Sequence, residues 1–209
     1  MRDMTTQQQD LKFTTCGDYM KGETFLISDT HWGHENILKF TDSKGNLIRG
    51  EKFSNVKEMN DCMYDNWQLH IKENDTVYHL GDLAFGPYKE TDFAKQFRKL
   101  NGKKYLVVGN HDDIPWVIQE KLFDDVMMWK RIKSHRMLLT HTPIHQSSLK
   151  TYDDGTKMIN VHGHIHQMPS PTKNHRCACV EWTDYTPIHI DDVFALNNYK
   201  TKVKETTDV

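Results

Sequence analysis

The stretch TFLISDTH, residues 24–31, decides the fold. Its first five residues form a short apolar run rich in β-forming side chains, which predicts a buried strand. Asp29 and His31 follow at once, where that strand stops. A carboxylate and an imidazole are therefore expected at one edge of a sheet.

The same pattern recurs twice farther along the chain. Residues 76–80, TVYHL, end on Gly81-Asp82, and residues 104–108, KYLVV with Lys104 first, end on the run Gly109-Asn110-His111-Asp112. Helices are expected between these strands, at 55–71 with Asn55 or Ser54 as N-cap and at 89–100. Strands that alternate with helices pair in parallel, and their carboxyl ends form the edge where sites develop.

The second half of the chain reads as more β-rich. A helix is expected at 113–122 and a final one at 191–198, and four closely spaced strands are expected at 125–130, 136–140, 158–161 and 176–182. The prediction is an α/β fold compatible with two sheets packed face to face. One domain is expected over residues 23–199, between a polar extension at 1–22, in which residues 11–16 are a candidate edge strand, and a polar tail at 200–209.

Composition excludes several classes of protein. The 209 residues are 37% hydrophobic and 27% charged, with a formal net charge of -2. So balanced a charge argues against a non-specific grip on nucleic acid, which needs many cations at phosphates. A local basic groove is the alternative to ordinary solvated faces for Lys103, Lys104, Lys130, Arg131 and Lys133.

The same composition predicts a cytoplasmic protein that does not enter a membrane. No apolar run approaches the length of a membrane span, and the first residues lack the apolar segment of a secretion signal. The cysteines are expected to be reduced. Cys177 and Cys179 would share one face of a strand, where packing is favoured over metal binding.

Five short motifs carry the chemistry, and each alone has an ordinary structural explanation as a turn, a cap or a strand end. In order they are Asp29-Thr30-His31, Gly81-Asp82, Gly109-Asn110-His111-Asp112, Thr140-His141-Thr142-Pro143 and Gly163-His164-Ile165-His166. All follow apolar strand-like runs, and all offer oxygen or imidazole donors without thiolate. That donor set suits divalent Mn, Fe, Zn, Ni or Co. The glycines are expected to allow sharp turns and keep bulk away from the ions.

Taken together, these motifs resemble the signature of calcineurin-like metallophosphoesterases, over roughly residues 24–190. The sequence around Asp29 and Asp82 resembles a compact group of these enzymes that is common in bacteria and their phages. The resemblance implies two mixed β-sheets packed as a sandwich with flanking helices. It also implies hydrolysis of phosphate esters with two divalent metal ions. Mn is the metal expected ahead of the others.

The resemblance assigns a role to each motif residue. One ion would be held by Asp29, His31, Asp82 and His166, and the other by Asp82, Asn110, His141 and His164. Asp82 would bridge them, and a carboxylate suits that place because a neutral bridge would leave two cations repelling each other. His111 would touch only the substrate, as general acid or as a donor to the phosphate, and Asn110 would also lie against the substrate.

One departure from the family pattern bears on the substrate. Protein phosphatases of this superfamily extend the second motif with Asp-Arg-Gly, whereas here Gly81-Asp82 continues as LAFG at 83–86. A protein phosphatase is therefore disfavoured, as is a double-strand-break nuclease with its added capping domain. A phosphodiester or nucleotide, including a cyclic nucleotide or short nucleic acid, is expected as substrate, and no protein partner is predicted. The alternatives are a broad phosphomonoesterase and a metal-stabilised binding or regulatory protein.

Weaker expectations concern residues near the motifs. His34 is a candidate phosphate contact with loop packing as the alternative, and Arg49 is a candidate bidentate phosphate contact with a solvated loop residue as the alternative. His79 and His162 are interpreted as structural. The polar loop 144–157 lies between two motifs and is expected to shape substrate entry.

Overall fold

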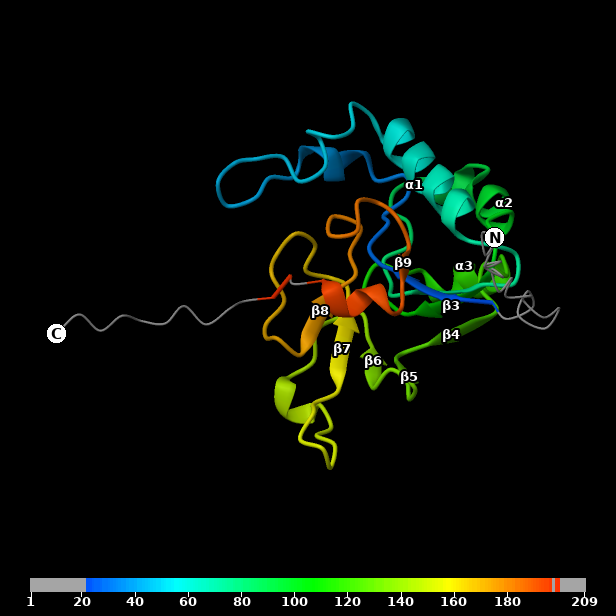
Figure 1. Ribbon diagram of the computed structural model, residues 1–209. Coiled ribbons are helices and arrows are strands. Elements are labelled where there is room, and N and C mark those ends of the chain that lie inside the picture. Colours follow the sequence, from blue (N-terminus) through cyan, green and yellow to red (C-terminus); the bar gives the residue numbers. More distant parts are fainter. Residues whose placement is uncertain (1–21, 197, 200–209) are drawn as a thin grey trace, which may run out of the picture.

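The computed structural model describes residues 22–196 together with 198 and 199. The candidate edge strand at 11–16, nearly all of the expected extension and the tail at 200–209 lie outside the described residues. The elements of the described residues are drawn in Figure 1.

The first sheet has five strands in the order β4-β3-β2-β1-β9. Four of them pair in parallel, and β9 runs antiparallel to β1. Their bounds are Thr24–Ile27 for β1, Thr76–His79 for β2, Lys103–Val107 for β3, Asp125–Met127 for β4 and Ile188–His189 for β9. The expected parallel strands therefore share one carboxyl edge.

The second sheet has four strands in the order β5-β6-β7-β8. Strands β6, β7 and β8 pair in parallel, and β5 is antiparallel to β6. The bounds are Lys130–Ile132 for β5, Met137–Leu139 for β6, Ile159–His162 for β7 and His175–Cys177 for β8. A bridge between Ser28 and Cys179 joins the end of β1 to the chain just after β8.

Alternation along the strands produces two apolar layers. In β1, Phe25 and Ile27 pack into a core with α1 residues such as Trp67, whereas Leu26 packs into a second core with Leu139 and Val161 of the second sheet. Helices thus cover one face of the first sheet and the second sheet covers the other (Figure 1). The predicted α/β sandwich of two mixed sheets with flanking helices is confirmed.

The helices lie where they were expected, but they are shorter than predicted. Helix α1 spans Val56–His70, and the Asn55 side chain caps it by accepting from the Glu58 amide at 3.0 Å. The helix expected at 89–100 is split by extended backbone at Thr91. The short elements are α2 at Phe93–Arg98, α3 at Ile114–Gln119, and the 3-10 turns η2 at Glu35–Lys39, η3 at Tyr88–Glu90, η4 at Gln146–Ser148 and η5 at Asp192–Ala195.

The last two expected elements are shorter than predicted. The helix expected at 191–198 is only the single 3-10 turn η5, and the strand expected at 176–182 ends at Cys177, where the chain leaves the sheet for turns. Within the described part of the chain, no helix combines the length and apolarity needed to cross a membrane.

We expect the layer between α1 and the first sheet to depend on Trp67. Its side chain is fully buried and its indole donates to the Asn101 carbonyl at 2.9 Å. Trp67→Ala should lower the free energy of unfolding by about 3–5 kcal/mol, because a large cavity remains. Leu69→Ala on the same helix is the matched control, since Leu69 is 78% exposed. Denaturant melts of both variants measure the difference, and equal losses would contradict this packing.

Candidate metal centre

The polar motif residues converge where the carboxyl ends of the two sheets meet. Three donor groups form a first cluster, made of Asp29, His31 and His166, and three form a second cluster, made of Asp82, His141 and His164. Within each cluster the donor atoms all lie within 4.8 Å of one another. Six side chains from four loops are thus brought together in the two arrangements that a metal ion would need.

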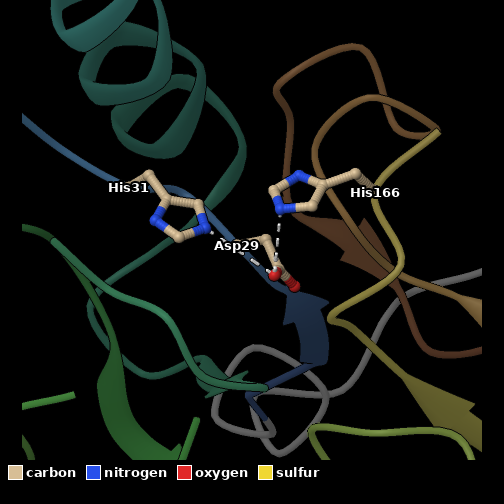
Figure 2. Close-up of side chains that lie close together, drawn as sticks. All are labelled: Asp29, His31 and His166. Carbon is tan, nitrogen blue, oxygen red and sulfur yellow. Dashed lines mark ion pairs between the residues drawn. The ribbon is translucent and has the colours of Figure 1, made fainter. Parts of the chain in front are cut away.

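The first cluster is centred on one carboxylate oxygen. Asp29 Oδ1 lies 3.9 Å from His31 Nε2 and 3.8 Å from His166 Nε2, and Figure 2 shows both rings directed at it. Asp29 Oδ1 and both ring nitrogens of His31 are buried without a hydrogen-bond partner among the described residues. Burial lowers the pKa of His31, as do Arg49 and the neighbouring histidines. A neutral imidazole beside an unpartnered carboxylate is the form that binds a cation.

The other oxygen of Asp29 is fully occupied. Oδ2 accepts from Ser28 Oγ at 2.5 Å, from the His164 amide at 2.9 Å and from Cys179 Sγ at 3.1 Å. These donors come from the residue after β1, from the loop after β7 and from the chain after β8. The contacts fix the carboxylate and leave Oδ1 as its free donor.

Asn110 lies next to the second cluster, in contact with His141. His141 Nδ1 lies 2.8 Å from the Leu80 carbonyl, to which it must donate, so in the neutral ring Nε2 is an acceptor. Asn110 Oδ1 nevertheless lies 2.9 Å from that Nε2. The amide oxygen and the ring nitrogen lie close enough to share a cation, so the residues fit a metal ion.

Asp82 lies between the clusters. Its Oδ2 is 3.7 Å from His31 Nε2 and 3.5 Å from His141 Nε2, and its Oδ1 accepts from the His111 amide at 2.9 Å. Burial raises the pKa of Asp82 and the nearby Asp29 adds to this, against the effect of His141. Two carboxylates held close in a buried site are a further reason for a cation to bind.

The backbone is strained at five of these residues. Asp29, His31, Asp82, His164 and His166 all have left-handed backbone, with φ between 47° and 71°. Such a conformation is costly for a residue with a side chain, of order 1–3 kcal/mol, and it clusters at functional sites. All five residues belong to the two clusters.

Glycines are needed here mainly for close approach. A Cβ on Gly81, whose φ is +100°, would lie 2.6 Å from His141 Nδ1, and one on Gly163 would lie 2.2 Å from Asp29 Oδ2. The expected sharp turn holds for Gly81, whereas Gly163 has no positive φ. Gly163 is required instead because the loop after β7 packs directly on the Asp29 carboxylate.

A buried ion pair supports the first cluster. Arg49 is fully buried, and its guanidinium pairs with Glu181 Oε1 at 2.7 Å and donates to the Asp29 and Thr30 carbonyls at 2.6 and 3.0 Å. Glu181 Oε1 also lies 2.8 Å from His166 Nδ1. Although burial opposes ionisation, Arg49 and His166 hold the pKa of Glu181 at about 2.

This network corrects the expectation for Arg49. A guanidinium without exposed surface, committed to Glu181 and two carbonyls, cannot reach a substrate phosphate. Arg49 instead positions the loop that carries Asp29 and His31, and Glu181 orients the His166 ring so that Nε2 faces the cluster.

His111 and His34 lie at the rim of the first cluster. His111 is exposed, and its ring centroid is 5.8 Å from that of His31. His34 is 9% exposed, its Nδ1 accepts from the Ile37 amide at 3.0 Å, and its ring stacks on Phe85 at 4.3 Å. His34 thus packs within its loop, its ring centroid lies 5.8 Å from that of His31, and its contact with a phosphate stays a prediction.

The two histidines interpreted as structural are buried and hydrogen-bonded. His79 Nε2 contacts Thr30 Oγ1 at 2.9 Å, and burial lowers the pKa of His79 to about 3. His162 contacts Ser170 Oγ at 3.0 Å, and burial lowers its pKa to about 4. Neither belongs to a cluster.

Two contributors were not found from the sequence. Asp112 accepts from three backbone amides, those of Asp82, Leu83 and Gly109, at 3.1, 2.8 and 2.8 Å, and so ties the loop after β2 to the loop after β3. The position of Asp112 directly after His111 in its motif was the sequence signal that could have identified it. Glu181 lies in none of the motifs and far from Arg49 along the chain, so no sequence signal indicated its role.

Comparison with known proteins agrees with this geometry. The model of the calcineurin-like phosphoesterase superfamily domain matches residues 23–181. The chain belongs to this superfamily. Its members are generally phosphoesterase hydrolases that bind divalent metals.

Proteins similar to this phosphoesterase-superfamily chain come from several organisms. An uncharacterized protein of Methanocaldococcus jannaschii, MJ1445, is 29% identical over 192 residues, which are 88% of this chain and 97% of the relative. The Gene 66 protein of Mycobacterium phage L5 is 30% identical over 43% of this chain and 39% of its own. The crystal structure of a protein of unknown function from Aquifex aeolicus, AQ665, matches with a TM-score of 0.63 and 27% identity, over 84% of this chain and all of that one.

We expect Arg49→Met to destabilise this superfamily member by about 3–5 kcal/mol, because it removes the guanidinium partner of the buried Glu181 carboxylate. Arg98→Met is the matched control, since Arg98 pairs with Glu120 at the surface and its loss should cost about 1 kcal/mol or less. Adding Glu181→Gln to Arg49→Met should restore part of the stability. Thermal melts of the three variants test this, and equal losses in the two single variants would refute it.

Proposed function

We propose that the protein is a phosphoesterase that depends on two divalent metal ions and hydrolyses phosphodiesters or nucleotides. The observation that carries the proposal is the place of Asp82, whose Oδ2 lies within 3.7 Å of an imidazole nitrogen from each side of the site. Asp29, His31, Asp82 and His166 would hold one ion, and Asp82, Asn110, His141 and His164 the other. Mn is the proposed ion, with Fe, Zn, Ni and Co as alternatives for this nitrogen and oxygen donor set.

When bound, a pair of such ions activates water and neutralises charge on the phosphate. The chain supplies the rest of the chemistry. His111, exposed beside His31, is proposed to donate a proton to the departing oxygen or a hydrogen bond to the phosphate. Its amide holds Asp82 Oδ1, so the loop that carries the acid is tied to the carboxylate between the clusters.

The preference for a diester is supported by apolar surface on two sides of the site. Phe85, 39% exposed, lies beside His111 with ring centroids 5.3 Å apart, and Trp129, 60% exposed, lines a cavity that Asn110 and His141 also line. A diester presents two organic groups, one for each side, whereas a monoester presents one. A broad phosphomonoesterase is the second candidate function.

The proposal includes a cytoplasmic location and one domain over residues 23–199. Free thiols at Cys62, Cys177 and Cys179 support a reducing compartment. A metal-stabilised binding protein without turnover has no need of His111, which is neither buried nor in either cluster.

We expect the Mn-loaded protein to hydrolyse an activated phosphodiester, and chelator to stop the reaction. Asp82→Asn should lose bound metal and turnover together, because the charge between the two ions is lost. Asp61→Asn is the control, since Asp61 is an exposed carboxylate on α1. Metal analysis and rates on mono- and diesters measure this. Activity confined to monoesters would favour the second candidate, and full activity of Asp82→Asn with two ions bound would reject the assignment.

We expect His111→Ala to separate catalysis from metal binding. Metal content should be kept while turnover falls by about 10²–10⁴-fold, the usual contribution of a positioned acid. The loss should shrink for esters with very acidic leaving groups, which depart without a proton. Asn110→Ala should instead weaken the second ion, with partial rescue by excess metal. His70→Ala on α1 controls for loss of a surface imidazole, and metal loss in His111→Ala would make His111 a ligand.

A further inference from the structure

A cavity of about 650 Å³ opens beside the second cluster, at the edge where the chain crosses from β4 to β5. The residues that line it are Val108, Gly109, Asn110, Met128, Trp129, Leu138, Thr140, His141, Thr142 and Ile144. A second cavity of about 630 Å³ lies between α1 and α2, and no residue of either cluster lines it. The first cavity is therefore the one that continues from the candidate metal centre.

Two of its lining residues belong to the site. Asn110 and His141 contact each other at 2.9 Å, and His141 lies 3.5 Å from Asp82 Oδ2. A phosphate held at the second cluster would thus have one of its ester groups at the mouth of this cavity.

The outer wall of the cavity is apolar and exposed. Met128 and Trp129 follow β4 directly and are 71% and 60% exposed, and Val108, Leu138 and Ile144 complete the apolar lining. Neighbouring large apolar side chains left open to water at a concave site mark a binding surface. An indole is also a flat face on which an aromatic group can stack.

We propose that this cavity, the Trp129 pocket, binds the base of a nucleotide substrate, so that the enzyme acts on nucleotide esters rather than on phosphate esters at large. The inference rests on the proposed phosphoesterase function and specifies its substrate. The base stacks on the Trp129 indole, the sugar spans the mouth, and the phosphate lies at the second cluster.

The rim of the pocket favours a base over an aliphatic chain. Thr142 is exposed there, and the exposed Asn110 brings an amide to the same rim. Ring nitrogens and exocyclic groups of a base can use these polar groups at its edge while its face stacks, whereas an acyl chain offers nothing to them. The volume of the Trp129 pocket lies within the range of small-molecule sites, about 300–1,000 Å³.

Equilibrium binding to the Mn-loaded protein tests the proposal, with four probes: inorganic phosphate, methyl phosphate, octyl phosphate and a nucleoside monophosphate. We expect the nucleotide to bind more tightly than the other three and to quench tryptophan emission. Trp129→Ala should weaken nucleotide binding by about 5- to 150-fold, which corresponds to the 1–3 kcal/mol of base–aromatic stacking. Phosphate affinity and metal content should not change.

Three controls define the result. Trp129→Phe should keep most of the nucleotide affinity, because a phenyl face still stacks. Ile118→Ala, at an equally exposed position on α3, should change nothing. Met128→Ala gives a second, smaller loss and replaces Trp129→Ala should that variant fail to fold. A free nucleoside should quench the emission of metal-free wild type but not of metal-free Trp129→Ala.

The outcomes separate the two proposals. Equal affinity for phosphate and nucleotide, or tighter binding of octyl phosphate, would overturn the Trp129 pocket while leaving phosphoester hydrolysis intact. An equal loss of phosphate and nucleotide affinity in Trp129→Ala would overturn it as well. Failure of the phosphoesterase function would appear separately, as absence of metal binding and of hydrolysis for every ester.

Discussion

The carboxylate of Asp29 is the contact on which the site depends. It is completely buried, and Oδ2 accepts from Ser28, from the His164 amide and from Cys179, so three segments of the two sheets meet on one oxygen. These bonds satisfy Oδ2 in a buried position, and they leave Oδ1 facing His31 and His166 with no hydrogen-bond partner of its own among the described residues. The carboxylate therefore joins the sheets and provides a donor atom with the same group.

Such convergence is costly, and the rest of the fold compensates for it. Left-handed backbone at Asp29, Asp82 and His164 would relax if the loops were free to move. The parallel strands hold the loop ends in register, and Asp112 ties two of these loops together through three amides. The glycines at 81 and 163 let the backbones touch without displacing a donor. Acceptor atoms without hydrogen-bond partners still lie close together, which is unfavourable, and a bound cation would offset this remaining cost.

The sequence predicted the fold and the motif residues because both depend on local patterns. Apolar runs that end in Asp29, Asp82 and Asn110 define parallel strands and their shared edge, and the structure brings those side chains together. The Arg49–Glu181 pair could not be predicted in this way. The two residues are 132 positions apart, and each alone looks like a solvated surface charge. The single 3-10 turn η5 was predicted as a longer helix, because hydrophobic periodicity does not show where a short helix ends.

The two clusters differ in a way that suggests how the proposed enzyme divides its work. In the first, His166 is oriented by a carboxylate that is itself paired with a buried guanidinium, and Asp29 and His31 are buried. In the second, His141 is oriented by a neutral carbonyl, and His164 and Asn110 are exposed. A buried, charge-supported cluster disfavours exchange with solvent, whereas an exposed one is open to an incoming ligand. The first cluster is thus suited to anchoring an ion, and the second, which adjoins the Trp129 pocket, to receiving the phosphate.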